Sequence, residues 1–412
     1  MIAFLDQYAH GTATALDLVD ALEEEIGADA GLQRIFRGFL FQPGVPYVMA
    51  ELSCDDTGGR IALSQARYVP EGSLAPVEGD WATPVCVRWE SDGNTEPAEK
   101  CRLLDSTSTS IALDGRCPSW VMPTKGAGGY YRWQVLPEAV DLLDRSGEVF
   151  DDLERMSLAD SLAARMLAGD LGADRYLAAV PTLAAALERA VATAPLEKVE
   201  LILDHVVAPT DIDAAREYLG AIYRRRLEFV GLPGGSESLV EAKRLRSRLI
   251  QFLAGVVEDP VIREDLGRQG RDYVGFGGDG RIHRDAVEPD LAEAAVAVAA
   301  REAGPAFFDH LTGLLGTESS PQTRSAVLAG IGAVRDPVLL ARARNLLLDE
   351  VLYTNEVPLL LAALSEPAVI DGTWTWVEGH IERLMERYPG GYAYWVPAHF
   401  EGFCSSQRVT GL

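Results

Sequence analysis

The chain has 412 residues, a formal net charge of −25 and a hydrophobic content of 48%. This length suits about three domains, and the apolar content is sufficient for large buried cores. A surface this acidic repels phosphate backbones, which argues against nucleic-acid binding. The chain contains no apolar run long enough to span a bilayer, and its start lacks the pattern of a signal peptide.

The first region, residues 1–38, is expected to be helical. In residues 15–22 the apolar side chains fall on one helical face and the acidic ones on the other, and Gly27 is expected to end this helix. A second short helix is expected around residues 32–36. Two helices this short cannot form a core alone, so we interpret the region as a remnant of a larger domain.

The second region, residues 39–135, has the alternation of β-strands. Residues 47–54, 61–68 and 85–89 are strand candidates, because β-branched and aromatic residues recur there at period two. The Asp-Asp-Thr-Gly-Gly sequence at 55–59 has the composition of a turn. Short strands at this spacing predict a small antiparallel β-sandwich.

Four of the five cysteines, Cys54, Cys86, Cys101 and Cys117, fall in this strand region, and Cys404 lies near the end of the chain. No Cys-x-x-Cys pair occurs, so a structural zinc site is not expected. The clustering fits disulfides in an oxidising, extracytoplasmic compartment. Buried free thiols in a cytoplasmic protein are the alternative.

The third region, residues 136–412, is predicted to be almost entirely helical. Successive helices of modest length with short polar links favour stacked helix pairs, an α-solenoid of the HEAT or armadillo type. The expected fold class is therefore multidomain α+β, mostly α. The expected helix starts are Ser157 with Asp160, Thr210 with Asp213, Asp259-Pro260, Ser320-Pro321 and Asp336-Pro337.

Motifs for catalysis are missing from the sequence. No two of the six histidines are four residues apart, which excludes a His-Glu-x-x-His zinc helix. Neither a Gly-x-Ser-x-Gly elbow nor a phosphate-binding Gly-Lys-Ser/Thr loop occurs. The glycine-rich stretch at 275–280 lacks spaced acidic ligands and is expected to be a surface loop. We predict no catalytic or metal-binding residue in this chain.

Two basic clusters stand out in the acidic chain, one at residues 224–226 and one at residues 243–248. They could bind an anionic group such as a peptide carboxylate. The alternative is a solvated helix face, ion-paired with the abundant acids. The candidate peptide-binding residues are Arg224, Arg225, Lys243, Arg246 and Arg248.

Several ordered motifs resemble the C-terminal part of M1-family zinc aminopeptidases, the group that includes the puromycin-sensitive and endoplasmic-reticulum enzymes. Gln-Pro-Gly-Val-Pro at 42–46 is similar to the entry into the family's β-sandwich. Leu-Ser-Gln-Ala-Arg-Tyr at 63–68 and Trp-Ala-Thr-Pro-Val at 81–85 continue the pattern. Trp-Val-Met-Pro at 120–123, followed by Gly-Tyr-Tyr-Arg at 129–132, is similar to the junction between sandwich and helical domain.

The resemblance implies a role for this junction. Its glycines connect two β segments and do not hold a ligand. Thr124 stands where the family usually has asparagine. The implied structural junction residues are Trp120, Pro123, Gly129, Tyr130, Tyr131 and Arg132.

The resemblance implies a noncatalytic C-terminal region made of a catalytic-domain remnant (1–38), a sandwich (39–135) and a helical domain (136–412). The chain would cover the active site of an upstream catalytic domain and help to bind and size-select peptides. Zinc would belong to that upstream domain and not to this chain, so the chain alone should be inactive. The rival hypothesis is a stand-alone helical-repeat scaffold that binds a protein partner.

Overall fold

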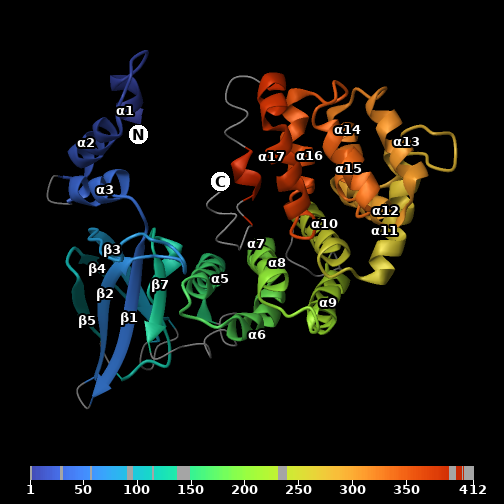
Figure 1. The fold of residues 1–412 in the computed structure, drawn as a ribbon. Helices are drawn as coiled ribbons and strands as arrows, with labels where there is room; N and C mark the ends of the chain where they lie inside the picture. The colour runs from blue at the N-terminus through green and yellow to red at the C-terminus, as the bar shows by residue number, and fades with distance from the viewer. Residues whose placement is uncertain are drawn as a thin grey trace. The chain divides into compact units, whose positions relative to one another are not determined.

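The structure is a computed structural model. It describes residues 2–27, 31–55, 58–90, 96–113, 116–136, 149–230, 239–388, 396–400 and 402. The described chain is mostly helical (Figure 1) and separates into two compact units, Met1–Ile202 and Leu203–Leu412. The boundary falls within one helix, α8 (Leu196–His205).

The first unit begins with three helices, α1 (Ile2–Gln7), α2 (Ala15–Ile26) and α3 (Leu32–Phe41). Helix α2 starts at a capping box, in which Thr14 and Asp17 exchange side-chain and backbone hydrogen bonds, and it ends at Gly27 as predicted. Among the described residues of these helices, Val19 alone is fully buried. The large apolar side chains exposed here are Ile2, Leu5, Ile26, Leu40 and Phe41.

Seven strands follow in two sheets. The first sheet has the order β5-β2-β1-β7 and the second the order β4-β3-β6. All described pairings are antiparallel except that of β7, which runs parallel to β1. The strands are β1 (Pro46–Asp55), β2 (Gly58–Arg67), β3 (Thr83–Trp89), β4 (Ala98–Leu104), β5 (Ser108–Ala112), β6 (Val121–Met122) and β7 (Arg132–Leu136).

Each sheet buries one face, as a sandwich requires. In β2 the side chains of Ile61 and Leu63 are fully buried, and in β3 those of Val85 and Val87 are. Strands β1, β2 and β3 match the segments predicted from alternation. Strand β6, the first of the two β segments expected on either side of the junction glycines, is only two residues long.

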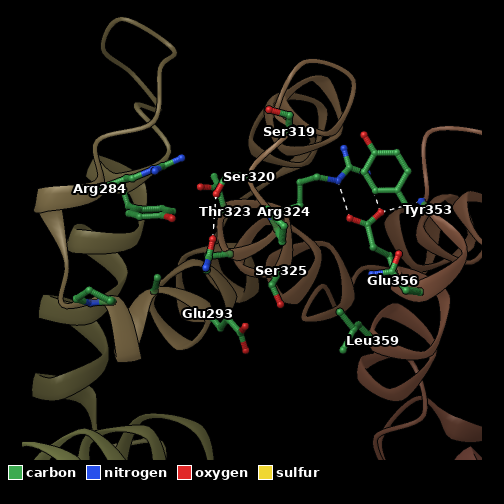
Figure 2. A pocket seen from close by; sticks show the side chains of 16 residues that line it. Arg284, Glu293, Ser319, Ser320, Thr323, Arg324, Ser325, Tyr353, Glu356 and Leu359 are labelled. Carbon is green, nitrogen blue, oxygen red and sulfur yellow. Dashed lines mark hydrogen bonds and ion pairs between the residues drawn. The ribbon is translucent and has the colours of Figure 1, made fainter.

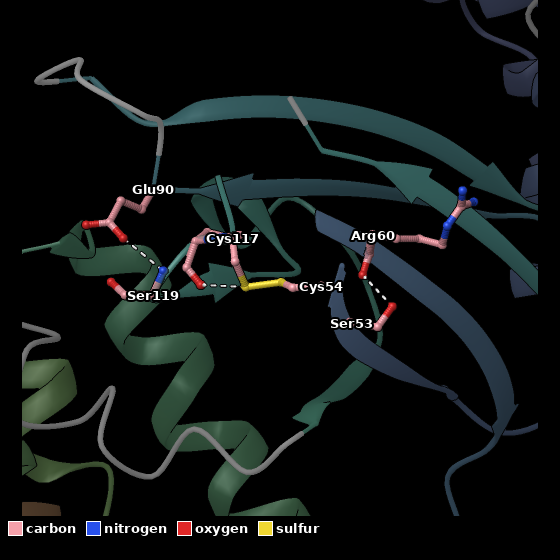
Figure 3. Close-up of a disulfide and its surroundings, with 7 residues drawn as sticks. Ser53, Cys54, Arg60, Glu90, Cys117 and Ser119 are labelled. Atoms are coloured by element: carbon pink, nitrogen blue, oxygen red, sulfur yellow. Dashed lines mark hydrogen bonds between the residues drawn. A yellow bond between two sulfur atoms is a disulfide. The ribbon is translucent and has the colours of Figure 1, made fainter. Parts of the chain in front are cut away.

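Two disulfides link the sheet region, so the disulfide alternative for these four cysteines is the one found. Cys54 bonds to Cys117, and Cys86 bonds to Cys101. Figure 3 shows the Cys54–Cys117 bond at the end of β1, where the Ser119 backbone N–H donates to the Glu90 carboxylate 2.8 Å away. Cys404 lies outside the described residues.

The first unit continues with helices α5 (Asp152–Leu167), α6 (Ala173–Ala184), α7 (Arg189–Thr193) and α8. The predicted start of α5 at Ser157 is wrong. Asp151 caps the helix through a capping box with Glu154, six residues earlier than the Ser157 signal. Ser157 instead accepts a 2.9 Å hydrogen bond from the Trp133 indole within the helix.

The second unit is helical throughout its described residues. Asp259, Ser320 and Asp336 each precede a proline at the first helical turn, as predicted. Thr210 does not cap α9, because that helix begins after Asp211. The helices are α9 (Ile212–Phe229), α10 (Leu239–Gly255), α11 (Pro260–Tyr273), α12 (Ala292–Glu302), α13 (Pro305–Leu315), α14 (Pro321–Gly332), α15 (Pro337–Leu346), α16 (Val357–Ala363) and α17 (Ile370–Arg387), with 3₁₀ turns η3 (Arg284–Ala286), η4 (Pro289–Leu291), η5 (Thr354–Glu356) and η7 (Pro397–Phe400).

Helix α12 packs closely against both α11 and α14, and these helices share one large apolar core with α13 and α16. The α-solenoid arrangement itself stays a prediction. None of the described helices is both long and apolar enough to cross a membrane. The sequence Tyr-Ala-Tyr-Trp-Val-Pro at residues 392–397 has the aromatic composition of a core segment, and it falls largely outside the described residues.

Helix α11 contacts α12 so closely that only glycine fits at position 270. A Cβ atom there would lie 2.9 Å from the Val296 backbone nitrogen and would overlap the Ala295 carbonyl. We expect Gly270→Ala to lower the free energy of unfolding by about 1–3 kcal/mol, through overpacking, in chemical denaturation. Gly313→Ala is the matched control, since no atom lies within 4 Å of its Cβ position, and it should be neutral or stabilising. Equal effects of the two changes would contradict this account.

Candidate functional site

The second unit contains a cavity of about 700 Å³ at the point where α12, α14 and α16 begin. The N-terminal end of a helix carries unpaired N–H groups and a partial positive charge, so these helix starts favour negative groups in the cavity. Figure 2 shows the lining side chains. They are Tyr273, Arg284, Pro289, Ala292, Glu293, Ser319, Ser320, Pro321, Gln322, Thr323, Arg324, Ser325, Tyr353, Asn355, Glu356 and Leu359.

A buried ion pair between Arg324 and Glu356 supports one wall of this cavity. The two side chains are 2% and 5% exposed and form two hydrogen bonds, of 2.5 Å from Nε and 2.7 Å from Nη2. The remaining N–H groups of Arg324 donate to the carbonyls of Leu315, Glu318 and Val351. Its guanidinium also lies 4.2 Å from the centre of the Tyr353 ring. Every donor of this arginine is therefore engaged within the protein.

The ion pair fixes the charge state of both groups. Burial alone would raise the pKa of Glu356, but hydrogen bonds from Arg324 and from the Tyr353 N–H hold it below its ordinary value. The hydrogen bond to Glu356 raises the pKa of Arg324. Because both groups stay charged and fully paired, they build the wall and leave ligand binding to other residues.

The free charges of the cavity belong to Arg284 and Glu293. Both are exposed, and within the described part of the chain neither has an oppositely charged partner at ion-pairing distance. Arg284 comes from η3, and Glu293 comes from the first turn of α12. Thr323 also lines the cavity, and its buried hydroxyl has no hydrogen-bond partner among the residues that the structure describes. Arg284 and Thr323 suit a carboxylate of a polar ligand, and Glu293 suits a cationic group.

The predicted basic clusters lie on α9 and α10 and do not line this cavity. The structure separates their members. Arg224 forms a 2.5 Å ion pair with Asp259, and Arg226 is buried. The other candidates are exposed and lack ion-pair partners among the residues that the structure describes: Arg225, Lys243, Arg246 and Arg248.

Sequence reasoning missed Arg284, Glu293, Arg324 and Glu356. They come from four separate segments, so no local spacing connects them. The one available signal was Arg324, the single charged residue of α14. Its partner lies 32 residues later and could not be identified without the fold.

In the first unit, a second buried ion pair joins the sheets to α5. Glu154 is fully buried and accepts from Arg88 of β3, with 2.9 Å between Nε and Oε1. The same carboxylate accepts from the backbone N–H of Gly126 at 3.1 Å and of Asp151 at 3.2 Å. The Arg88 guanidinium also lies over the Trp120 ring. This cluster holds together a strand, the glycine segment and the start of a helix.

Three of the predicted junction residues are Trp120, Pro123 and Tyr131. Trp120 contacts the segment that leads into α5, and Pro123 and Tyr131 strengthen the turn before it. Trp120 is buried, and its ring meets the Phe150 ring edge-on at 5.7 Å. The Tyr131 hydroxyl donates to the Pro123 carbonyl at 2.7 Å, and burial raises the pKa of Tyr131 to about 12. These contacts fit a structural role at the junction.

The other three junction residues differ in their surroundings. Arg132 forms an ion pair with Asp160 of α5. Tyr130 is exposed, and its ring approaches Phe39 of α3. A side chain at Gly129 would overlap the Tyr131 ring. The glycine segment itself forms a short 3₁₀ turn, η2 (Lys125–Ala127), between β6 and β7, so it connects two strands.

The described residues contain no group of three or more His, Cys, Asp or Glu side chains placed to hold a metal ion.

Comparison with known proteins assigns this chain to a family. The family model for the ERAP1-like C-terminal domain matches residues 120–411. The chain belongs to the ERAP1-like C-terminal domain family. It is also 20% identical, over 395 residues, to the puromycin-sensitive aminopeptidase of Caenorhabditis elegans. A second relative, the tricorn protease-interacting factor F2 of Thermoplasma acidophilum, is 23% identical over 177 residues.

The ERAP1-like match and these two relatives confirm the resemblance to M1 aminopeptidases that the sequence motifs predicted. The alignment with the puromycin-sensitive enzyme covers 94% of this chain but 40% of the relative, and that with factor F2 covers 43% and 20%. The chain therefore spans less than half the length of the relatives it matches.

Proposed function

We propose that this chain is the noncatalytic C-terminal region of an M1-type zinc aminopeptidase, which removes N-terminal residues from peptides. The alignment over 94% of this chain but 40% of the puromycin-sensitive enzyme carries the proposal. The zinc and the residues that activate water would belong to an upstream catalytic domain, because this sequence has no His-Glu-x-x-His motif. We propose the same domain limits as from the sequence: 1–38, 39–135 and 136–412.

The exposed apolar face of the first three helices supports an upstream partner. Ile2 is 78% exposed and Phe41 is 63% exposed, whereas such side chains are normally covered in a stable domain. We propose that the catalytic domain covers this face in the parent enzyme. The rival hypothesis of a stand-alone scaffold does not say which protein would cover this apolar face.

The helical unit would bind the distal part of a peptide substrate. The cavity offers an unpaired arginine, Arg284, beside three helix starts, which together favour a carboxylate. The exposed cations Arg225, Lys243, Arg246 and Arg248 would attract the acidic end of a peptide to an otherwise negative surface. Size selection would follow from engaging both ends of the substrate at once.

Activity assays on the parent enzyme test this assignment. We expect hydrolysis of a fluorogenic amino-acid amide with added zinc only when the upstream segment is present. In the active enzyme, Arg284→Gln should raise KM for a long peptide by about threefold to tenfold, the worth of one hydrogen bond made by an exposed side chain. The same KM should also rise, through slower association of the peptide, in a variant that carries glutamine at four positions: Arg225, Lys243, Arg246 and Arg248. Neither should change the rate with the short amide.

Arg268→Gln is the matched control, since Arg268 is exposed on α11 away from the cavity. Activity of the chain alone would overturn the noncatalytic assignment. A parallel change for amide and peptide would contradict the distal binding role. Absence of activity with the upstream segment would favour the scaffold or a degenerate peptidase.

A further inference from the structure

The disulfide between Cys86 and Cys101 joins two residues that face each other directly in the β3–β4 ladder. Their Cα atoms are 3.9 Å apart. Most disulfides span about 4.4–6.8 Å between Cα atoms, and bonds outside this range are easier to reduce. The Cα atoms of Cys54 and Cys117 are 5.7 Å apart, within the usual range. The protein therefore carries one ordinary and one unusual disulfide.

The unusual disulfide is open to attack from solvent. Cys101 is exposed, and β4 is an edge strand in which five of seven residues are exposed. Thiol exchange requires that a thiolate reach one sulfur along the bond axis, and an exposed edge strand allows this approach. No neighbouring strand covers β4 on its outer edge in the described sheet.

The pairing of β3 with β4 has support besides this bond. Seven residue pairs of β3 and β4 already align in register, and the bond spans 15 residues. The Cys54–Cys117 bond spans 63 residues and joins segments that are not paired in a ladder, so it restricts the unfolded chain more. Opening the shorter link should leave both sheets folded.

We propose that Cys86–Cys101 is a reversible thiol-exchange site that takes small thiols such as glutathione. A glutathione thiolate attacks Sγ of Cys101, a mixed disulfide forms, and Cys86 leaves as a thiolate that takes up a proton. A second glutathione thiolate then attacks the glutathione sulfur and releases Cys101 and glutathione disulfide. Two thiols are oxidised for each protein disulfide that is reduced.

Opening this site changes what β4 can support. Glu99 of β4 forms an ion pair with Lys125 of the η2 turn. The next residue, Gly126, donates to the buried Glu154 carboxylate of α5. Greater mobility of β4 would therefore weaken the contacts at the start of the helical region. The connection between the two is the Glu99–Lys125 ion pair, which is exposed and weak. The expected effect is local mobility in β4 and η2, without unfolding.

The test is a redox titration of the whole chain. The protein is equilibrated in glutathione buffers of graded reduced-to-oxidised ratio, quenched in acid and alkylated, and the free cysteines are mapped by mass spectrometry. Cys86 and Cys101 should become free at a ratio at least about tenfold lower than Cys54 and Cys117. Amide exchange of residues 98–104 should then rise while that of β1 and β2 stays constant.

The paired variants provide the controls. Cys86→Ser with Cys101→Ser should reproduce the exchange pattern of the opened protein and lower the Tm less than Cys54→Ser with Cys117→Ser. Joint opening of the two disulfides, or earlier opening of Cys54–Cys117, would overturn the proposal. The wild-type titration decides the matter even where a variant fails to fold.

Discussion

Replacing Glu356 by glutamine is expected to lower the free energy of unfolding of the second unit by about 3–5 kcal/mol. The change removes the negative partner of Arg324, whose side chain is 2% exposed and cannot recover hydration. The guanidinium would stay buried with its charge uncompensated. Chemical denaturation followed by circular dichroism measures the loss.

Double substitution separates the charge from the hydrogen bonds. Arg324→Met combined with Glu356→Gln removes the buried charge, but it leaves the carbonyls of Leu315, Glu318 and Val351 without their donor. We expect no recovery of stability, because the three orphaned carbonyls cost about 1–3 kcal/mol each and offset the gain from removing the buried charge. Asp309→Asn breaks the exposed pair with Arg342 and should cost at most about 1 kcal/mol. A cost for Glu356→Gln as small as this control would contradict the account.

The same ion pair makes stability depend on pH. The pKa of Glu356 is lower in the folded protein than its ordinary value, so the unfolded chain binds its proton more readily. The stabilisation is therefore complete above the unfolded pKa of about 4.3 and is lost as pH falls through the folded pKa. The Glu356→Gln variant should lose less stability between neutral pH and pH 3 than the wild-type chain.

Replacing Glu154 by glutamine is the second change with a large expected effect, again about 3–5 kcal/mol on unfolding of the first unit. Glu154 is fully buried and joins Arg88, Gly126 and Asp151 through one carboxylate. An amide has one acceptor oxygen in place of two, so at least one of these donors loses its partner. Thermal or chemical unfolding measures the effect.

The location of the Glu154 effect is as informative as its size. Hydrogen exchange should increase at the first turn of α5 and in η2, since both rely on this carboxylate. Asp105→Asn, which breaks the exposed ion pair with Arg34, is the matched control in the same unit and should be nearly neutral. A uniform increase in exchange across the sheets would show that Glu154 does not act locally.

The sequence revealed those strands whose side chains alternate between core and solvent. Strands β2 and β3 bury every second residue, so their period was visible, whereas β1 is buried in its first half and exposed toward its end. Strand β4 escaped prediction because it lies at an edge with most side chains exposed, and its sequence, Ala-Glu-Lys-Cys-Arg-Leu-Leu, has no buried face to encode. Its place depends on register with β3.

Helix starts followed a similar rule. The Asp-Pro and Ser-Pro signals marked α11, α14 and α15, because proline at the first turn restricts the chain locally. The prediction of a helix start at Ser157 was wrong, because the Ser157 hydroxyl accepts a tertiary hydrogen bond from Trp133 and does not cap a helix. The cavity could not be predicted from local sequence patterns either. Arg284 and Glu356 line the same cavity only because helices distant in sequence pack together.

The parallel pairing of β7 with β1 has a consequence for synthesis on the ribosome. Tyr47 lies opposite Arg132, so the partner of the first strand is the last strand of the sandwich to leave the exit tunnel. One edge of β1 therefore stays unpaired while the intervening chain is translated, a period in which chaperone binding or misassociation competes with closure. Sandwich completion should be slow for a region of this size, because so distant a contact must form before the sheet is whole.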